Sequence, residues 1–285
     1  MTKLKIALQK SGRLSDKSLE LIRECGINLT NGARKLLSVS SNFPLEVMYL
    51  RDDDIPRYVA DGVADIGMVG ENVVREEQAG VRIIEALGFA KCRLSLAIPR
   101  TIEYDGLRFF TGKKVATSYP NILRNFFEEQ GVDVEIHEIS GSVEIAPGIG
   151  LSDGVFDIVS SGSTLISNGL NEVEKVMDSQ AVLIGQNELE PEKQNILSSL
   201  MFRMMAVKKS RNNKYILLNA PNEKLDDITS LIPGMKSPTV MPLAEEGWSS
   251  VHSVLEESQF WNIIDQLKDK GAQGILVIPI EKMIV

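Results

Sequence analysis

The most specialised composition in the sequence lies between residues 153 and 165. The segment reads DGVFDIVSSGSTL, a β-branched apolar run that ends in small hydroxyl residues around Gly162 and continues as a helical pattern. A phosphate cradle needs these residue types, because glycine lets the backbone approach the anion while N–H groups and hydroxyls donate hydrogen bonds. Asp153 and Asp157 are placed to reach a ribose hydroxyl or a magnesium ion. A serine-rich strand-to-helix turn without a ligand has the same composition.

Two further polar segments follow apolar runs and precede helical patterns, the position where α/β proteins hold ligands. Lys10-Ser11-Gly12-Arg13 comes after Leu4–Leu8, so that its basic side chains can contact a nucleotide phosphate. Arg51-Asp52-Asp53-Asp54 follows Leu45–Leu50, and the guanidinium of Arg51 can hold a diphosphate in bidentate geometry. Both segments are also compatible with solvated turns, with Asp54 as a helix cap.

Acidic residues occupy similar positions in Gly70-Glu71-Asn72 and Gly141-Ser142-Val143-Glu144. Considered alone, Glu71 and Glu144 are explained by the favourable interaction of a carboxylate with the first turn of a helix. A ligand-binding role for either residue needs further support.

Cysteine and histidine are scarce, with two of each in the chain. Cys25 and Cys92 are far apart, which excludes a disulfide framework and fits a reducing cytoplasm. A Cys/His zinc site is disfavoured, and a serine-type triad has few ways to form. We interpret His137 and His252 as structural and Cys92 as a small buried residue rather than a nucleophile.

Length and charge restrict the class of protein. The 285 residues are enough for two domains, and 43% hydrophobic with 25% charged residues is typical of a globular protein. A net charge of −8 without a basic block argues against nucleic acid and anionic membranes as partners. The charge does not exclude polyphosphate substrates, because loop amides, a few arginines and Mg²⁺ can hold them within one cleft. No stretch is long enough for a membrane span, and the N-terminus lacks the apolar core of a signal peptide.

The segments that carry these motifs alternate between short apolar strands and helical patterns, which predicts α/β architecture. We expect one lobe from residues 1–97 and 179–207, and a second lobe from residues 98–178 that contains the serine-glycine loop. The chain would then cross twice between the lobes, an arrangement suited to hinge closure over a ligand. A polar, basic break at residues 208–213 is expected to end the helix before it.

The remaining residues, 208–285, show the pattern βαββαβ of a ferredoxin-like domain. Small appended domains of this kind bind effectors or mediate assembly, although the fold alone proves neither role.

Taken together and in this order, the motifs resemble the ATP phosphoribosyltransferase family in its long form, which carries its own regulatory domain. The resemblance runs along essentially the whole chain. The segments that carry it are Gln9–Leu14, Arg51–Pro56, Asp61–Gly67, Gly70–Asn72, Cys92–Leu94, Ala116–Pro120, Gly141–Glu144, Asp153–Leu165, Asn168–Leu170 and Ile278–Met283. One departure is Gly148, where some relatives carry arginine, so no role is expected for this position.

The resemblance implies a two-lobed catalytic unit like that of periplasmic binding proteins, followed by an ACT-like domain. It implies transfer of the phosphoribosyl group of phosphoribosyl pyrophosphate (PRPP) to N1 of ATP, the first step of histidine biosynthesis, with Mg²⁺ held mainly by substrate phosphates. The residues that would bind PRPP are Asp153, Asp157, Ser160, Ser161, Gly162, Ser163 and Thr164. Those that would bind ATP are Gly12, Arg13, Glu71, Arg93 and Tyr119. Arg51, Glu144 and Asp157 would act in catalysis.

The resemblance also implies feedback inhibition by histidine, inhibition by AMP, and a homo-oligomer between dimer and hexamer. Asn219, Met235, Ser237 and Thr239 are the expected histidine contacts, although strand ends and turns carry such residues without an effector. A non-catalytic two-lobed binding protein is the main alternative, and a regulatory subunit without catalysis is a third. The absence of an export signal and the specialised loop count against a non-catalytic binding protein. The complete phosphate loop counts against a regulatory subunit without catalysis.

Overall fold

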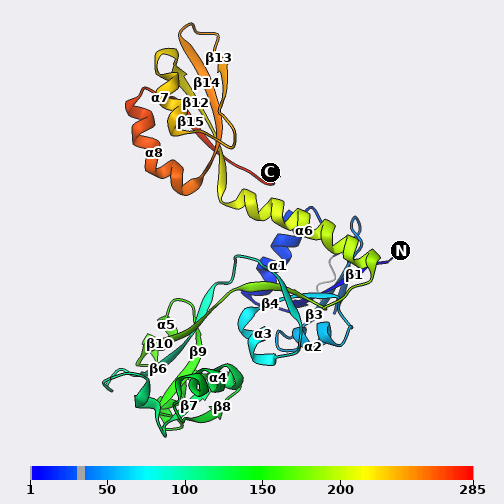
Figure 1. Cartoon of the computed structure of the whole chain (residues 1–285), viewed down its shortest axis with the longest axis vertical. Coiled ribbons are helices and arrows are strands. Elements are labelled where there is room, and N and C mark those ends of the chain that lie inside the picture. Colours follow the sequence, from blue (N-terminus) through cyan, green and yellow to red (C-terminus); the bar gives the residue numbers. More distant parts are fainter. Residues whose placement is uncertain (1, 31–35, 285) are drawn as a thin grey trace. The chain divides into compact units, whose positions relative to one another are not determined.

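A computed structural model describes residues 2–30 and 36–284 of the chain (Figure 1). They divide into two compact units, the first formed by residues 1–23 and 27–197 and the second by residues 24–26 and 198–285. Two sheets build the first unit. We call residues 2–30, 36–91 and 180–197 lobe I, and residues 92–179 lobe II.

Lobe I is a mixed six-stranded sheet in the order β2-β3-β1-β4-β11-β5, in which β3, β1 and β4 are parallel. Helices α2 and α3 pack on this sheet through apolar side chains that include Ile55, Val59 and Val73. The strands are β1 (Leu4–Gln9), β2 (Leu37–Val39), β3 (Leu45–Leu50), β4 (Ile66–Gly70), β5 (Arg82–Ala86) and β11 (Ala181–Gly185). The helices are α1 (Arg13–Glu24), α2 (Ile55–Ala60) and α3 (Glu71–Glu77).

Lobe II is a five-stranded sheet in the order β10-β6-β9-β7-β8, and α4 covers one of its faces (Figure 1). Its strands are β6 (Cys92–Pro99), β7 (Lys114–Thr117), β8 (Glu135–Glu138), β9 (Gly154–Val159) and β10 (Leu170–Ser179). Its helices are α4 (Pro120–Gln130), α5 (Ser163–Ser167) and the short 3-10 segments Leu107–Phe110, Val143–Ile145 and Pro147–Ile149. Phe110, Phe127 and Phe156 fill the core under α4.

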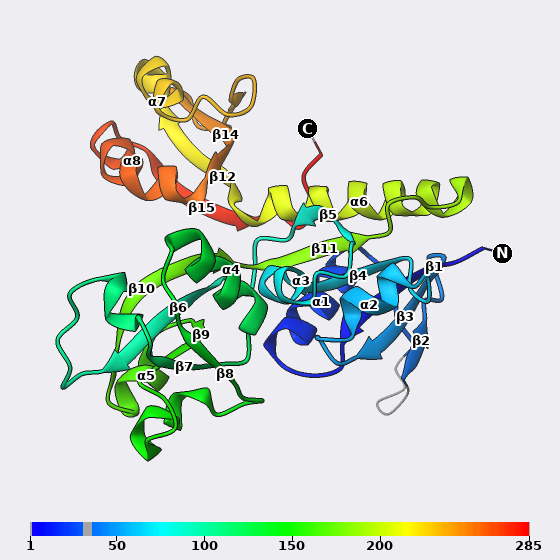
Figure 2. The ribbon, with the colours of Figure 1, turned by 60° about the horizontal axis from the view of Figure 1, so that its bottom comes forward.

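The chain enters and leaves lobe II through two neighbouring antiparallel strands, β6 and β10, which run side by side (Figure 2). The expected lobe boundary at residues 97 and 98 falls inside β6, which joins the second sheet already at Cys92. The boundary is displaced because residues 92–99 form one continuous strand that pairs with both β9 and β10 along its length.

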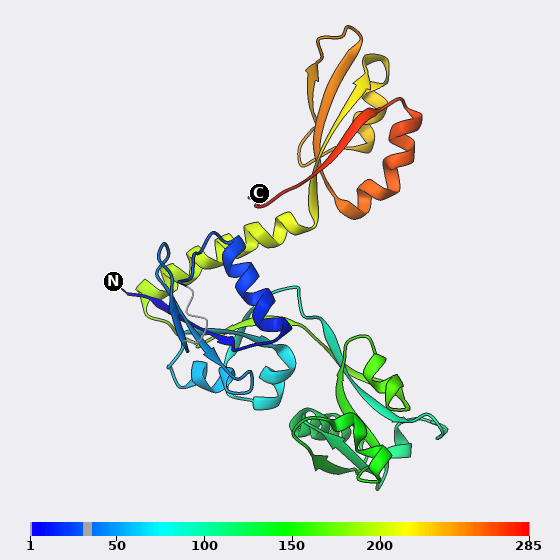
Figure 3. The ribbon, with the colours of Figure 1, turned by 180° about the vertical axis from the view of Figure 1, so that it is seen from behind.

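The second unit contains an antiparallel sheet in the order β13-β14-β12-β15. Its strands are β12 (Asn213–Pro221), β13 (Thr239–Pro242), β14 (Trp248–Glu256) and β15 (Gln273–Pro279). Helices α7 (Leu225–Leu231) and α8 (Glu257–Asp269) lie on the same face of this sheet, where Ile216, Leu218 and Phe260 are buried (Figure 3). The order of elements is the predicted βαββαβ.

Helix α6 (Pro191–Arg211) runs through the basic segment that was expected to interrupt it. Lys208, Lys209 and Arg211 occupy its last turn, where cationic side chains interact favourably with the helix dipole and have good helix propensity. The break therefore comes at Asn212. None of the helices found in residues 2–30 and 36–284 combines the length and apolar character needed to cross a membrane.

Candidate active site

The serine-glycine loop follows the carboxyl end of β9 and lines a cavity of about 290 Å³. Gly162 has a φ of +81°, in the left-handed region, and directly precedes α5. This conformation turns the chain from the strand into the helix, and glycine adopts it without strain. The hydroxyls of Ser161 and Ser163 lie 3.0 Å apart across the turn. The cavity is lined by Arg13, Glu144 and residues 157–165.

Two carboxylates face this cavity from different segments of lobe II. Asp157 comes from β9, and Glu144 comes from the 3-10 segment Val143–Ile145. Burial raises the pKa of Asp157, a hydrogen bond from the N–H of Ile158 lowers it, and the charge of Glu144 raises it further. The charge of Glu144 therefore disfavours ionisation of Asp157, and a cation bound near both carboxylates would relieve that repulsion.

The strand-to-helix turn of lobe I supplies the cationic side of the same cavity. Gly12 has a φ of +102° and accepts a hydrogen bond from the N–H of Asp16, so that α1 begins at Arg13. Arg13 lies on the first turn of α1 and contributes to the lining of the loop cavity. Ser15 is buried in the first turn of this helix.

Arg93 forms a bidentate ion pair with Glu172 of β10 and also contacts the start of the loop. Its Nε and Nη2 atoms each lie 2.5 Å from a carboxylate oxygen of Glu172, which also accepts a hydrogen bond from Ser95. Nη1 of Arg93 lies 3.4 Å from the carbonyl oxygen of Ser160 at the start of the loop. The guanidinium lowers the pKa of Glu172, so the pair is fully charged. A phosphate that binds Arg93 must compete with this carboxylate.

A second cavity of about 530 Å³ has walls from both lobes. Lobe I contributes Asp52, Asp53 and residues of α3, and lobe II contributes residues 118–121, Arg124 and residues 138–141. Burial raises the pKa of Tyr119 most, the charges of Asp157 and Asp52 raise it further, and a hydrogen bond with Asn72 lowers it. The phenol is therefore neutral at physiological pH. Thr117 of β7 pairs with Phe156 of β9, so Tyr119 and Asp157 follow neighbouring positions of adjacent parallel strands and the two cavities are neighbours.

Five of the residues expected at the catalytic site line neither cavity: Gly12, Arg51, Glu71, Arg93 and Asp153. Asp153 precedes β9 at the opposite end of the strand, where its carboxylate accepts the N–H of Lys114 at 2.9 Å and pairs with Lys113. Its contacts tie β7 to β9, so the geometry does not support the expected role near a ribose. Glu71 pairs with Arg75 one turn along α3, and Arg51 is exposed at the end of β3.

Local sequence patterns do not by themselves distinguish Asn72, Glu76 or Glu172 from surface residues. Each makes hydrogen bonds to residues at least 45 positions away, and such contacts leave no mark on local periodicity. One signal was present for Asn72. At Gly70, any Cβ would lie 2.4 Å from the side-chain oxygen of Asn72, which explains the glycine in the segment Gly70-Glu71-Asn72.

The four expected histidine contacts are distributed over the second unit. Asn219 pairs with Ser250 and Thr239 pairs with His252, so that Asn219 and Thr239 lie on the sheet face opposite α7 and α8. Met235 and Ser237 belong to the loop that precedes β13. On the same face, Tyr215 and Ser250 hydrogen-bond the two ring nitrogens of His252 at 2.7 and 3.0 Å.

The donor set suits a hard divalent cation. Within residues 2–30 and 36–284, no three side chains of His, Cys, Asp or Glu gather into a cage for a metal. The carboxylates of Asp157 and Glu144 share the loop cavity, and oxygen ligands of this type fit Mg²⁺, which keeps several waters or substrate oxygens in its shell.

A family model described as ATP phosphoribosyltransferase matches residues 51–206, more than half of the chain. The chain belongs to the ATP phosphoribosyltransferase family. A second model, described as the C-terminal domain of HisG, matches residues 210–282, so this member has the long form. An ATP phosphoribosyltransferase of Bacteroides thetaiotaomicron is 60% identical over 99% of this chain and all of that protein. One of Cytophaga hutchinsonii is 58% identical over 99% of both chains.

Solved structures agree on the fold of this ATP phosphoribosyltransferase family member. A chain of the ATP phosphoribosyl transferase (HisG:HisZ) complex from Thermotoga maritima matches with a TM-score of 0.64 and 27% identity, over 72% of this chain and 98% of that one. A histidine kinase sensor domain with similarity to periplasmic binding proteins matches with a TM-score of 0.50 and 11% identity, over 73% and 91%. The predicted family and fold class are confirmed.

Proposed function

We propose that the two neighbouring cavities of the first unit are the PRPP and ATP sites of an ATP phosphoribosyltransferase. Members of this family transfer the phosphoribosyl group of PRPP to N1 of ATP and release pyrophosphate, in the first step of histidine biosynthesis. The observation that carries the assignment is the cavity in which the serine-glycine loop, two carboxylates and Arg13 meet. A phosphate, a ribose and a second anionic substrate require these three kinds of group together.

In the PRPP site, the loop receives the 5′-phosphate. Hydroxyls of Ser161, Ser163 and Thr164 donate to the phosphate oxygens, and Gly162 keeps the turn narrow enough for the anion to approach the backbone. Ser160 belongs to the same lining. Asp157 accepts hydrogen bonds from the ribose hydroxyls, because it lies in the strand just before the loop.

In the ATP site, the nucleotide occupies the cavity next to Tyr119, whose neutral phenol offers a ring surface and a hydrogen bond. Arg13 and Gly12 lie at the start of α1 and meet nucleotide phosphates from lobe I. Arg93, with Arg51 and Glu71, completes the set that we assign to the nucleotide and its phosphates.

The chemistry requires no protein nucleophile. The bond from C1′ of the ribose to the pyrophosphate oxygen breaks, the pyrophosphate leaves with the electron pair, and the lone pair of adenine N1 forms the new bond at C1′ with inversion. The carboxylates of Asp157 and Glu144 stabilise the positive charge that develops on the ribose ring, and the two sites hold the reactants in line. Mg²⁺ bound with the pyrophosphate, near Asp157 and Glu144, would neutralise the leaving group.

We assign regulation to the second unit. Asn219, Met235, Ser237 and Thr239 are the proposed contacts for histidine as feedback inhibitor, with AMP as a further inhibitor in the catalytic unit. We also propose a cytoplasmic homo-oligomer, from dimer to hexamer. The family model for a separate C-terminal domain supports a distinct role for residues 210–282.

The decisive experiment is a turnover assay with ATP, PRPP and Mg²⁺, with and without histidine. We expect release of pyrophosphate and formation of a phosphoribosylated adenine nucleotide, and a lower rate when histidine is present. Omission of either substrate or of Mg²⁺ provides the control. Binding of ATP and PRPP without any turnover would contradict the proposal and favour a binding protein with the same two-lobed fold.

A further inference from the structure

Helix α4 of lobe II receives its N-terminal cap from lobe I. The backbone N–H groups of Asn121 and Ile122 donate to the two carboxylate oxygens of Glu76, at 2.8 and 3.0 Å. The side-chain amide of Asn121 donates back to the carbonyl oxygen of Glu76 at 3.0 Å. Glu76 lies in the last turn of α3 and is 7% exposed. Three hydrogen bonds thus join two helices of different lobes.

The cap is needed because α4 begins without one of its own. Pro120 has no N–H, and the side chain of Tyr119 makes no capping hydrogen bond. The next two N–H groups would otherwise face the interior of the contact without a partner. A carboxylate satisfies both and interacts favourably with the positive end of the helix dipole.

One turn earlier on α3, Asn72 holds the residue that precedes α4. Its side chain hydrogen-bonds with Tyr119. Its side-chain oxygen accepts from the hydroxyl of Ser179 at 2.9 Å, and its N–H donates to the same hydroxyl at 3.1 Å. Ser179 is the last residue of β10, where the chain returns to lobe I. Asn72 and Glu76 therefore lie on one face of α3, and from there they contact Tyr119 and the start of α4.

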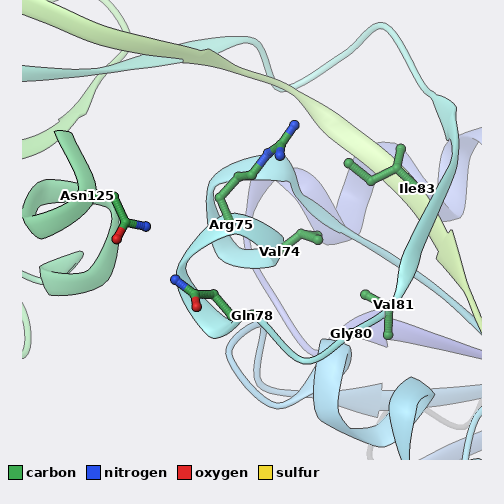
Figure 4. A pocket seen from close by; sticks show the side chains of 7 residues that line it. All are labelled: Val74, Arg75, Gln78, Gly80, Val81, Ile83 and Asn125. Carbon is green, nitrogen blue, oxygen red and sulfur yellow. The ribbon is translucent and has the colours of Figure 1, made fainter. Parts of the chain in front are cut away.

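Open space borders this contact. The 530 Å³ cavity includes Val73, Glu76 and residues 118–121. Another cavity, of about 630 Å³, includes Arg75 of α3 and Gln78 directly after this helix, with Asn125 of α4 on the opposite wall (Figure 4). With cavities beside it, the helix contact depends on its few polar bonds. Loss of the cap would allow α4, and Tyr119 with it, to shift.

We propose that Glu76, together with Asn72, is a positioning clamp that holds Tyr119 in place for the nucleotide by binding the start of α4 to α3. Glu76 itself is not a catalytic residue, because its carboxylate is occupied by backbone N–H groups. The inference rests on the proposed ATP site. The proposed ATP site alone does not predict which substrate a change at Glu76 would affect. The clamp does: loss of the cap should weaken binding of ATP and leave binding of PRPP at the phosphate loop unchanged.

The test is the variant Glu76→Gln, measured by separate KM values for ATP and PRPP. The amide has one acceptor oxygen, and its NH₂ group faces an N–H donor, so half of the cap is lost at constant size. We expect a 10- to 30-fold rise in KM for ATP, with the KM for PRPP changed less than threefold. Hydrogen exchange of the amides of Asn121 and Ile122 should accelerate in the same variant, which is a readout independent of activity.

The matched control is Glu129→Gln, which removes the same charge from an exposed position of α4 and should change neither KM nor exchange. The variant Asn121→Ala removes the bond back to the Glu76 carbonyl and a bond from Arg124 on the same helix, and it keeps the carboxylate cap. It therefore provides a milder test if Glu76→Gln folds poorly. We expect a two- to fivefold rise in KM for ATP. The clamp would be refuted if Glu76→Gln and Asn121→Ala both kept the wild-type KM for ATP. An equal rise of the KM values for ATP and PRPP would refute it as well. A wild-type chain without turnover would instead refute the proposed function.

Discussion

Replacing Gly162 by alanine tests the phosphate loop with the smallest possible change. The residue has a φ of +81°, where a side chain costs about 1–2 kcal/mol. A Cβ at this position would meet nothing closer than Cγ1 of Val159, at 3.9 Å, so steric clash adds nothing to that cost. The whole penalty is therefore backbone strain.

The loop is exposed, so the variant can relieve the strain by leaving the left-handed conformation when no substrate is bound. PRPP must then restore that conformation, and the cost appears in binding. A penalty of about 1–2 kcal/mol corresponds to a rise in KM for PRPP of about 5- to 30-fold at 25 °C. The KM for ATP and the melting temperature should change little.

The assay is steady-state pyrophosphate release at varied PRPP and saturating ATP, with thermal unfolding measured in parallel. Gly112→Ala is the matched control, because Gly112 has a φ of +70°, open space for a Cβ, and a place in lobe II before β7. There the strain should lower the melting temperature by a few degrees and leave both KM values unchanged.

A second variant, Ser163→Asp, tests whether the loop binds the 5′-phosphate even if Gly162→Ala has no effect on KM for PRPP. The new carboxylate lies in the cavity lining and repels an anion whether or not the loop can relax. We expect an increase in KM for PRPP above 30-fold. If both variants keep the wild-type KM for PRPP, the loop does not hold the 5′-phosphate and the reasoning is refuted.

Four further predictions concern the two carboxylates, the arginine pair and the effector surface. Because the charge of Glu144 raises the pKa of Asp157, Glu144→Gln should move the acidic limb of the pH profile of kcat/KM for PRPP to lower pH, and an unmoved limb would contradict this coupling. Burial also raises the pKa of Asp157 above its unfolded value, so the folded state binds more protons and stability falls as pH rises through that interval. Asp157→Asn should therefore melt at a higher temperature than wild type at pH 7 while losing activity at least 100-fold, and a lower melting temperature would be inconsistent with this sign. Glu172→Gln frees the guanidinium of Arg93 and should lower KM for ATP two- to fivefold, whereas a higher KM would mean that Arg93 acts only by holding the loop. Thr239→Ala should raise the histidine concentration for half-inhibition at least fivefold with uninhibited turnover unchanged, and equal inhibition would remove Thr239 from the effector site.

The sequence was sufficient for the features that depend on neighbouring residues. The β-branched run before Gly162 predicts β9, and the helical pattern after this glycine predicts α5. The alternation in residues 213–279 predicts the βαββαβ unit in the right order, since β12, β14, α7 and α8 bury one face on the same core. The residues that produce these patterns lie within a few positions of one another in the sequence.

What the sequence could not supply were contacts between distant residues. The bond between Arg93 and Glu172 joins positions 79 apart, and the cap between Glu76 and Asn121 joins positions 45 apart. Considered without their partners, Glu76 and Glu172 each have the sequence context of a solvated surface charge. The boundary of lobe II was displaced for the same reason, because strand pairing rather than composition decides which sheet residues 92–97 join.

The pairing of Cys92 with Ser179, at the two ends of lobe II, has a consequence for the order of folding. Strands β5 and β11 of lobe I are antiparallel neighbours, yet roughly 90 residues of chain separate them. If lobe II folds first, its ends come together as one strand pair, and the connection between β5 and β11 behaves like a short hairpin loop. The loop-closure entropy that lobe I must overcome then falls by about 2 kcal/mol. In that order of folding, lobe II is a nested folding unit that brings β11, the last strand of the first sheet along the chain, next to β5.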